Sequence, residues 1–219
     1  MSAYDLCVIT ARCDRFGRSH LDVAKAALEG GCRLLQFRDK TLSSRHLWSL
    51  GLEMRRLTRE YGARLIINDR VDIALAVEAD GVHLGDEDLP IAAARRLIGE
   101  RAIIGASVSA AAQARQAQSV GATYLGVGPV YPTASKADAG EAIGPALITE
   151  VKRGMSLPVL ALGGINRDNV AAVIRAGADG VAVISAVSEA EDMVAAASGL
   201  LEAIRSAQRR VGQVRDLPH

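Results

Sequence analysis

The sequence EADGVHLG at residues 78–85 contains, in order, the end of a helix, small residues and the start of a buried strand. The same order recurs in VGATYLGVG at 120–128 and in AGADGVAVIS at 176–185. Glycine in such a turn stops the helix, and a short apolar run without clean alternation is typical of a strand covered on both faces. This recurring order therefore indicates repeated units in which a helix is followed by a parallel strand.

Short apolar runs alternate with longer amphipathic stretches along the whole chain. The strand-like runs are residues 4–10, 32–38, 64–69, 81–85, 102–107, 123–130, 157–165 and 180–185. The helix-like stretches are residues 19–30, 43–61, 71–79, 89–98, 109–120, 144–154, 167–176 and 189–207. This alternation predicts an α/β protein with a single (β/α)8 TIM barrel. An open doubly wound sheet is the main alternative, but it rarely has eight consecutive units in 219 residues.

The composition fits one large globular domain. We expect residues 1–219 to form a single barrel whose last ten or so residues are a loose tail. The chain is 49% hydrophobic with a net charge of +1, which gives no reason to expect a nucleic acid or a membrane as partner. Cys7, Cys13 and Cys32 lack metal-site spacing, and we see no signal peptide, so we expect reduced thiols in a cytoplasmic protein. A homo-oligomer is compatible with the sequence.

The segment LLQFRDK at 34–40 begins as a buried strand and ends in three charged residues. Because a strand alternates its faces, Gln36, Arg38 and Lys40 point one way and Asp39 points the other. One face of the strand end thus carries an amide and two cations. These groups either face solvent or hold an anion.

Polar residues follow nearly every predicted strand, at the end where barrel enzymes have their sites. Among them are Asn68, Asp69, Asp88, Ser107, Thr133, Ser135, Lys136 and Ser185. Asp69 and Asp88 follow adjacent strands, and two carboxylates beside a phosphorylated ligand suit Mg²⁺. Asp69 could instead cap the helix that follows it, and Asp88 could be a solvated loop acid.

The loops after the last two predicted strands suggest a second anion site. They are LGGIN at 162–166 and ISAVS at 184–188, and barrels often bind phosphate at this place. Gly163 and Gly164 permit close approach of the backbone to a ligand. The two glycines could equally serve a tight turn alone.

These residues resemble the thiamine phosphate synthase family over nearly the whole chain. The most specific stretches are QFRDK, NDRVDIALAVEADGVHLG, GVGPVYPTASK and LGGI, in this order and spacing. Members of that family are (β/α)8 barrels that join an aminopyrimidine methyl diphosphate to a thiazole phosphate and release pyrophosphate. The resemblance implies a Mg²⁺-dependent transferase of thiamine biosynthesis, with small-molecule substrates.

The resemblance also implies roles for individual residues. The pyrimidine diphosphate ligands would be Gln36, Arg38, Lys40, Asn68, Ser107 and Lys136, of which Arg38, Lys40, Ser107 and Lys136 act on the reacting group. The thiazole phosphate would be held by Thr133, Ser135, Gly164, Ile184 and Ser185. Asp69 and Asp88 would bind Mg²⁺, and His83 would either line the pyrimidine pocket or be a hydrogen-bonded core histidine.

The chain departs from the family pattern at three places. Asp86 stands where glutamine is usual, Ser135 replaces a threonine, and Val108 and Ser109 follow Ser107 in place of a histidine and a hydroxyl residue. We expect Asp86 to act beside the metal rather than as a direct ligand. A related thiazole tautomerase is a second possible function, although it should carry an acid–base histidine at the end of the strand at 123–130, where this chain has GVGPV. A non-catalytic phosphate-binding barrel is a third.

Overall fold

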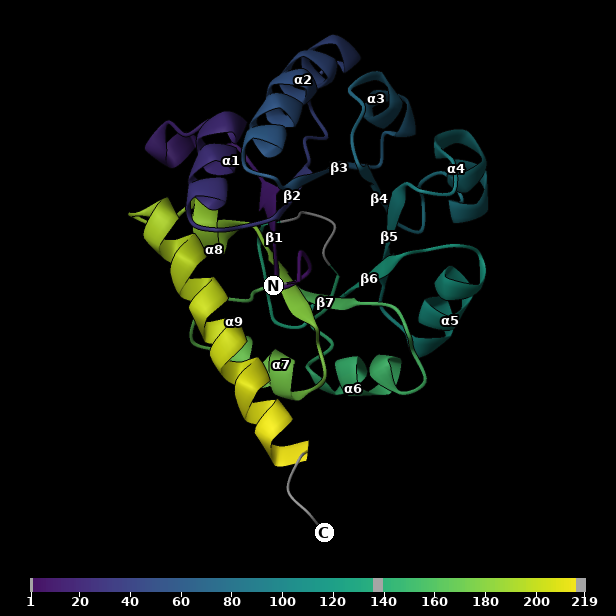
Figure 1. Cartoon of the computed structure of the whole chain (residues 1–219), viewed down its shortest axis with the longest axis vertical. Helices are drawn as coiled ribbons and strands as arrows, with labels where there is room; N and C mark the ends of the chain where they lie inside the picture. The colour runs from purple at the N-terminus through teal and green to yellow at the C-terminus, as the bar shows by residue number, and fades with distance from the viewer. Residues whose placement is uncertain (1, 136–139, 216–219) are drawn as a thin grey trace.

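The chain folds into a closed barrel of parallel strands. The computed structural model describes residues 2–135 and 140–215. The strands are β1 (Leu6–Thr10), β2 (Leu34–Phe37), β3 (Arg64–Asn68), β4 (Gly81–Leu84), β5 (Ile103–Val108), β6 (Tyr124–Val127), β7 (Val159–Leu162) and β8 (Gly180–Val183). Each strand pairs in parallel with the next, and β8 closes on β1 (Figure 1). The predicted (β/α)8 barrel is confirmed.

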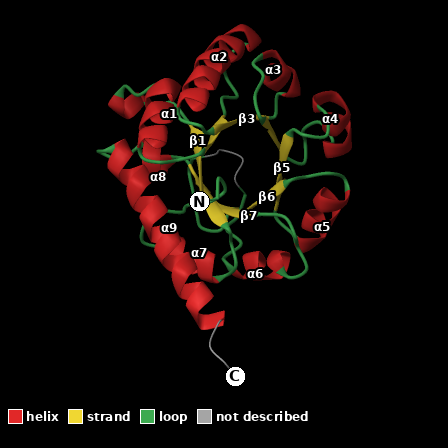
Figure 2. Cartoon of the chain, in the orientation of Figure 1, coloured by secondary structure: helices red, strands yellow, loops and turns green. Residues whose placement is uncertain are grey.

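Helices surround the strands on all sides (Figure 2). They are α1 (His20–Glu29), α2 (Ser44–Glu60), α3 (Val71–Ala76), α4 (Ile91–Ile98), α5 (Ala111–Ser119), α6 (Ala146–Lys152), α7 (Val170–Arg175), α8 (Ser185–Ser188) and α9 (Met193–Arg215), with a short 3-10 helix, η1, at Asp14–Phe16. In the part of the chain that the structure describes, no helix is both long and apolar enough to cross a membrane.

The last predicted helix, at 189–207, differs most from the structure. The long α9 begins only at Met193, and the short α8, at Ser185–Ser188, precedes the predicted range. Asp192 separates them, because its carboxylate accepts a hydrogen bond from the Ala195 amide at 2.9 Å and so begins a new helix. The helix α9 continues to Arg215, so residues 210–215 are helical rather than part of a loose tail.

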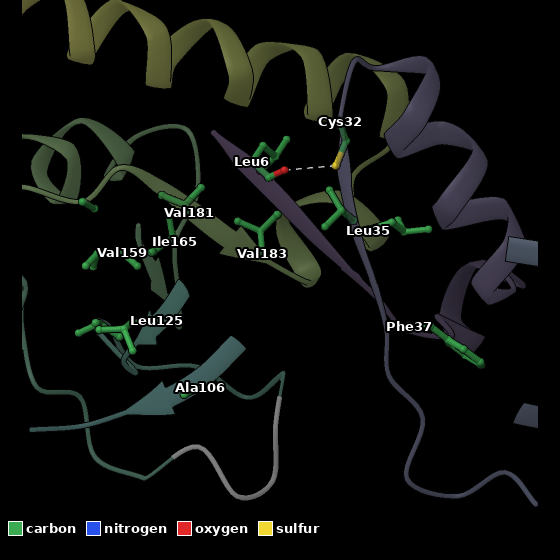
Figure 3. Packing of buried hydrophobic residues seen from close by; sticks show 14 of the residues in the cluster. Leu6, Cys32, Leu35, Phe37, Ala106, Leu125, Val159, Ile165, Val181 and Val183 are labelled. Atoms are coloured by element: carbon green, nitrogen blue, oxygen red, sulfur yellow. Dashed lines mark hydrogen bonds between the residues drawn. The ribbon is translucent and has the colours of Figure 1, made fainter. Parts of the chain in front are cut away.

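Strand alternation divides the buried side chains between two cores. Leu35 and Phe37 point outward from β2 and pack in the cluster between strands and helices, part of which is drawn in Figure 3. In that view the Cys32 thiol donates to the carbonyl of Leu6 on β1, at 3.4 Å. Leu34 points the other way, into a smaller cluster inside the barrel. The same alternation sends the polar residues at the strand ends toward the barrel mouth.

The order of residues that recurs at 78–85, 120–128 and 176–185 has a structural explanation at the end of the barrel where the strands begin, opposite the mouth. In each repeat, the residue just before the strand is Asp80, Thr123 or Asp179. The side-chain oxygen of each accepts a backbone N–H from the start of the preceding strand. The donors are Leu65, Ile104 and Val159, at 2.7, 2.9 and 2.7 Å. We call these three side chains the strand-start caps. Their place far from the mouth indicates a role in stability.

Candidate active site

A cavity of about 750 Å³ opens at the carboxyl ends of the strands. Most of the predicted site residues contribute to its wall: Arg38, Lys40, Asn68, Asp69, His83, Asp88, Ser107, Thr133, Ser135, Gly164, Ile184 and Ser185. Lys136 lies outside the described residues. Gln36 lies in β2 and is buried, with 2% of its surface exposed. Residues from seven strand ends, far apart in sequence, thus come together in one mouth.

His83 on β4 connects the cavity to a polar chain inside the barrel. Its Nδ1 lies 2.8 Å from the Tyr124 hydroxyl, and its Nε2 lies 2.9 Å from Ser107 Oγ. A Cβ at Gly105 would lie 2.1 Å from the Tyr124 ring and 2.4 Å from His83 Nδ1, so only glycine leaves room for this pair. Nearby, the Gln36 side-chain oxygen is buried without a hydrogen-bond partner among the described residues. His83 is therefore a hydrogen-bonded core histidine that also lines the cavity.

Asp69 and Asp88 follow the neighbouring strands β3 and β4, and their carboxyl groups lie side by side at the mouth. Burial, together with the neighbouring carboxyl of Asp88, raises the pKa of Asp69 from 3.8 to about 6. The cations Lys40 and Arg38 act in the opposite direction and lower it. Two acids and two cations thus interact at one place, as the strand-end pattern predicted.

The backbone holds these two acids in specific conformations. Asp69 has a positive φ of 61°, an uncommon conformation for a residue other than glycine. Its amide donates to the carbonyl of His83 at 2.9 Å. Asp69 is not a helix cap, because α3 begins after Arg70 and lacks a side-chain cap. The Asp88 carboxylate accepts the amide of Gly85 at 2.7 Å, so Asp88 is not simply a solvated loop acid.

The loops after β6 and β8 meet on the far side of the mouth. Ser135 Oγ donates to Ser185 Oγ at 3.0 Å, although fifty residues separate the two serines. The Ser135 amide donates to Thr133 Oγ1 at 3.2 Å. Three hydroxyl groups predicted to bind one phosphate therefore lie together.

Gly163 and Gly164 follow β7 and have positive φ angles of 92° and 61°. A Cβ at Gly163 would lie 2.5 Å from that of Pro129, and one at Gly164 would lie 2.5 Å from the Pro132 carbonyl oxygen. Asn169 donates a hydrogen bond to the Gly164 carbonyl at 2.9 Å. The tight-turn interpretation of the two glycines is therefore supported, and both glycines still line the cavity.

The residue Asp86 lies exposed on the rim of the cavity. Its carboxylate accepts a hydrogen bond from the side-chain amide of Gln113, on α5, at 2.9 Å. The Gln113 oxygen in turn accepts the Ser109 amide at 2.8 Å and the Ser109 hydroxyl at 3.1 Å. This rim network joins the loops after β4 and β5 at two of the three departures from the family pattern. Gln113 was not predicted from the sequence, because it lies in the first turn of a helix and not at a strand end.

A (β/α)8 barrel whose mouth gathers paired carboxylates, cations and hydroxyl groups belongs to the class of barrel enzymes that bind phosphorylated ligands. The particular family follows from comparison with known proteins. The chain belongs to the family described as thiamine monophosphate synthase, whose sequence model matches residues 6–187. The resemblance noted in the sequence is thereby confirmed.

Individual relatives match over almost their full length. A thiamine-phosphate synthase of Desulfitobacterium hafniense (strain Y51) is 49% identical over 203 residues, which cover 93% of this chain and 98% of the relative. A thiamine-phosphate synthase from Moorella thermoacetica is 48% identical over 208 residues, which cover 95% of this chain and 99% of the relative. Among solved structures, a thiamine phosphate pyrophosphorylase from Pyrococcus furiosus has a TM-score of 0.86 and 42% identity, covering 94% of this chain and 97% of the other.

Proposed function

We propose that this protein catalyses the formation of thiamine phosphate from an aminopyrimidine methyl diphosphate and a thiazole phosphate, with release of pyrophosphate. Near-full-length relatives are named thiamine-phosphate synthases, which confirms the activity expected from the sequence. The observation that carries the proposal for this chain is one cavity whose wall contains the predicted metal and thiazole phosphate residues together with four of the predicted diphosphate ligands, Arg38, Lys40, Asn68 and Ser107. The three cysteines are free and buried, which fits a cytoplasmic enzyme.

The cavity offers separate places for the two substrates. On one side Arg38 and Lys40 would bind the diphosphate, because a guanidinium suits bidentate contacts and an ammonium acts as a point charge. On the other side Ser135 and Ser185, already hydrogen-bonded to each other, would turn their hydroxyls to the thiazole phosphate. The pyrimidine ring would then lie between them, over His83.

The two carboxylates fit a Mg²⁺ ion. Burial and the neighbouring Asp88 raise the pKa of Asp69 to about 6, and a divalent cation between the two acids would relieve this repulsion. Within residues 2–135 and 140–215 no group of three or more His, Cys, Asp or Glu side chains could hold a metal. Two carboxylates are enough for Mg²⁺, since it completes its shell with water and substrate phosphate. When bound, Mg²⁺ would neutralise charge on the leaving diphosphate.

The reaction requires the pyrimidine methylene carbon to lose its bond to a diphosphate oxygen and to form one with the thiazole nitrogen. The diphosphate leaves with the electron pair of the broken bond, so the protein need not supply a nucleophile. Arg38 and Lys40 would stabilise the departing negative charge, and the cavity would shield the pyrimidine methyl cation from water. Fixed charges, rather than an acid–base pair, would perform the catalysis.

The decisive experiment incubates the pure protein with both substrates and Mg²⁺ and assays pyrophosphate and thiamine phosphate together. The variant Lys136→Ala should lose 10²- to 10³-fold in rate and keep the circular dichroism spectrum and the unfolding midpoint of the parent. Binding of both substrates without release of pyrophosphate would instead indicate a non-catalytic phosphate-binding barrel.

A further inference from the structure

His20, the first residue of α1, is buried behind the loop that follows β2. Only 3% of its surface is exposed, and it does not belong to the cavity wall. Its Nδ1 lies 3.0 Å from Thr10 Oγ1 at the end of β1, and its Nε2 lies 2.9 Å from Asp39 Oδ2. Both ring nitrogens are therefore occupied, and the chemistry proposed above does not use this histidine.

The Asp39 carboxylate organises the loop that follows it. While Oδ2 contacts His20, Oδ1 accepts the Thr41 amide and the Thr41 hydroxyl, each at 2.7 Å, and the Leu42 amide at 3.0 Å. Only 9% of this side chain is exposed. One carboxylate thus holds the turn between β2 and α2, and His20 holds the carboxylate.

Strand alternation links this buried contact to the cavity. The His20 ring packs edge-on against Phe37, with the ring centroids 5.2 Å apart and the planes at 75°. Phe37 and Asp39 therefore both contact His20 on the outer side of the chain. The residues between and after them, Arg38 and Lys40, line the cavity. A shift of Asp39 would move both cations, because they are its neighbours in the chain.

The histidine itself sits on a rigid support. Ser19 and Asp22 form a capping box at the start of α1, in which each side chain accepts the backbone amide of the other residue. The distances are 2.8 Å from the Ser19 amide to Asp22 Oδ2 and 3.2 Å from the Asp22 amide to Ser19 Oγ. The backbone of His20 is thereby fixed between two capped positions.

We propose that His20 is a positioning residue for the diphosphate half of the site: it holds Asp39 and Phe37 so that Arg38 and Lys40 present their charges to the anion. The identity of that anion rests on the proposed function. The thiazole phosphate side, built from the loops after β6, β7 and β8, lies on other elements, so His20 acts on one substrate and not on both.

The test uses two substitutions that each keep one of the two hydrogen bonds. Asparagine places an amide near the position of Nδ1, so His20→Asn can still reach Thr10 but not Asp39. Glutamine extends to the position of Nε2, so His20→Gln can still reach Asp39. His46→Asn is the matched control, since His46 lies exposed in the first turn of α2 and contacts the Ser43 hydroxyl at 3.0 Å.

The measurements are KM for each substrate, kcat, the unfolding midpoint, and the Kd of inorganic pyrophosphate with Mg²⁺ by titration calorimetry. His20→Asn should raise both the KM of the aminopyrimidine diphosphate and the Kd of pyrophosphate by about 10-fold, because small misplacements of binding groups cost one to two orders of magnitude. The KM of thiazole phosphate should stay within about 2-fold of the parent value. His20→Gln and His46→Asn should resemble the parent in all of these quantities.

Three results would overturn the inference: an unchanged pyrophosphate Kd in His20→Asn, equal changes in the KM of both substrates, or equal losses in His20→Asn and His20→Gln. If His20→Asn does not fold, Asp39→Asn tests the same link and should raise the pyrophosphate Kd similarly. Failure of the proposed function is distinguishable, because it would appear as absent turnover in the unmodified protein. The pyrophosphate titration would still report on His20.

Discussion

Replacing Asp80 with alanine should lower the free energy of unfolding by about 2–4 kcal/mol. The Asp80 carboxylate accepts the Leu65 amide at 2.7 Å and pairs with the Arg55 guanidinium at 2.6 Å. Leu65 is fully buried, so most of the loss comes from a hydrogen bond between an N–H and a charged acceptor, about 1.5–3 kcal/mol. The partly buried ion pair, with side chains 16% and 29% exposed, adds about 0.5–1 kcal/mol.

Urea unfolding followed by circular dichroism at neutral pH measures this difference. Asp80→Asn keeps an acceptor for the Leu65 amide and removes the charge, so its free energy of unfolding should fall by about 1 kcal/mol. Glu60→Ala is the control, because the Glu60 pair with Arg56 is exposed on α2 and is worth at most about 0.5 kcal/mol. Kinetic constants should not change, since Asp80 lies opposite the mouth. The reasoning is refuted if Asp80→Ala loses no more stability than Glu60→Ala.

Three further predictions concern the mouth and the turn that follows β2. Asp69→Asn and Asp88→Asn should each raise the Mg²⁺ concentration for half-maximal rate, and unchanged titration curves would place the metal elsewhere. Burial alone would raise the pKa of Asp39, but hydrogen bonds from Thr41 and His20 outweigh it and lower the pKa to about 2. The resulting stabilisation is at most about 2 kcal/mol after screening by solvent. It is fully present above pH 4 and is lost as the pH falls toward 2. The free energy of unfolding of Asp39→Asn, measured between pH 5 and 2, should lack this part of the decrease with falling pH. Asp86→Gln should weaken Mg²⁺ binding modestly, by roughly 10- to 100-fold at most, and leave the rate at saturating Mg²⁺ within a few-fold. A collapse of the rate that excess Mg²⁺ cannot restore would make Asp86 a direct ligand.

The architecture was predictable because each strand is a short apolar run and each helix a longer amphipathic one. Element ends were less predictable. The run at 157–165 gives a strand only over Val159–Leu162, since the glycines after it turn the chain sharply. The division between α8 and α9 depends on a single capping carboxylate at Asp192, which the hydrophobic pattern does not register.

The candidate site was predictable where it follows from topology. In a parallel barrel all strands end at one rim, so Asp69, Asp88, Ser107 and Ser185 had to lie near one another. Contacts between a helix and a loop were not predictable in this way. The bonds of Asp86 to Gln113 and of Asp39 to His20 depend on how each helix is rotated about its axis, and the sequence pattern leaves that angle undetermined.

The strand-start caps also bear on how the barrel assembles from its parts. Each cap joins two strands that are consecutive in the chain, and only 15, 19 and 20 residues separate the bonded groups. A cut in the exposed turn between Glu100 and Arg101 would leave every cap within one fragment, with Asp80 in the first and Thr123 and Asp179 in the second. Each of the two half-barrels made in this way would keep its own strand-start caps. Only the strand pairs between the halves, β4 with β5 and β8 with β1, would have to form when the fragments associate.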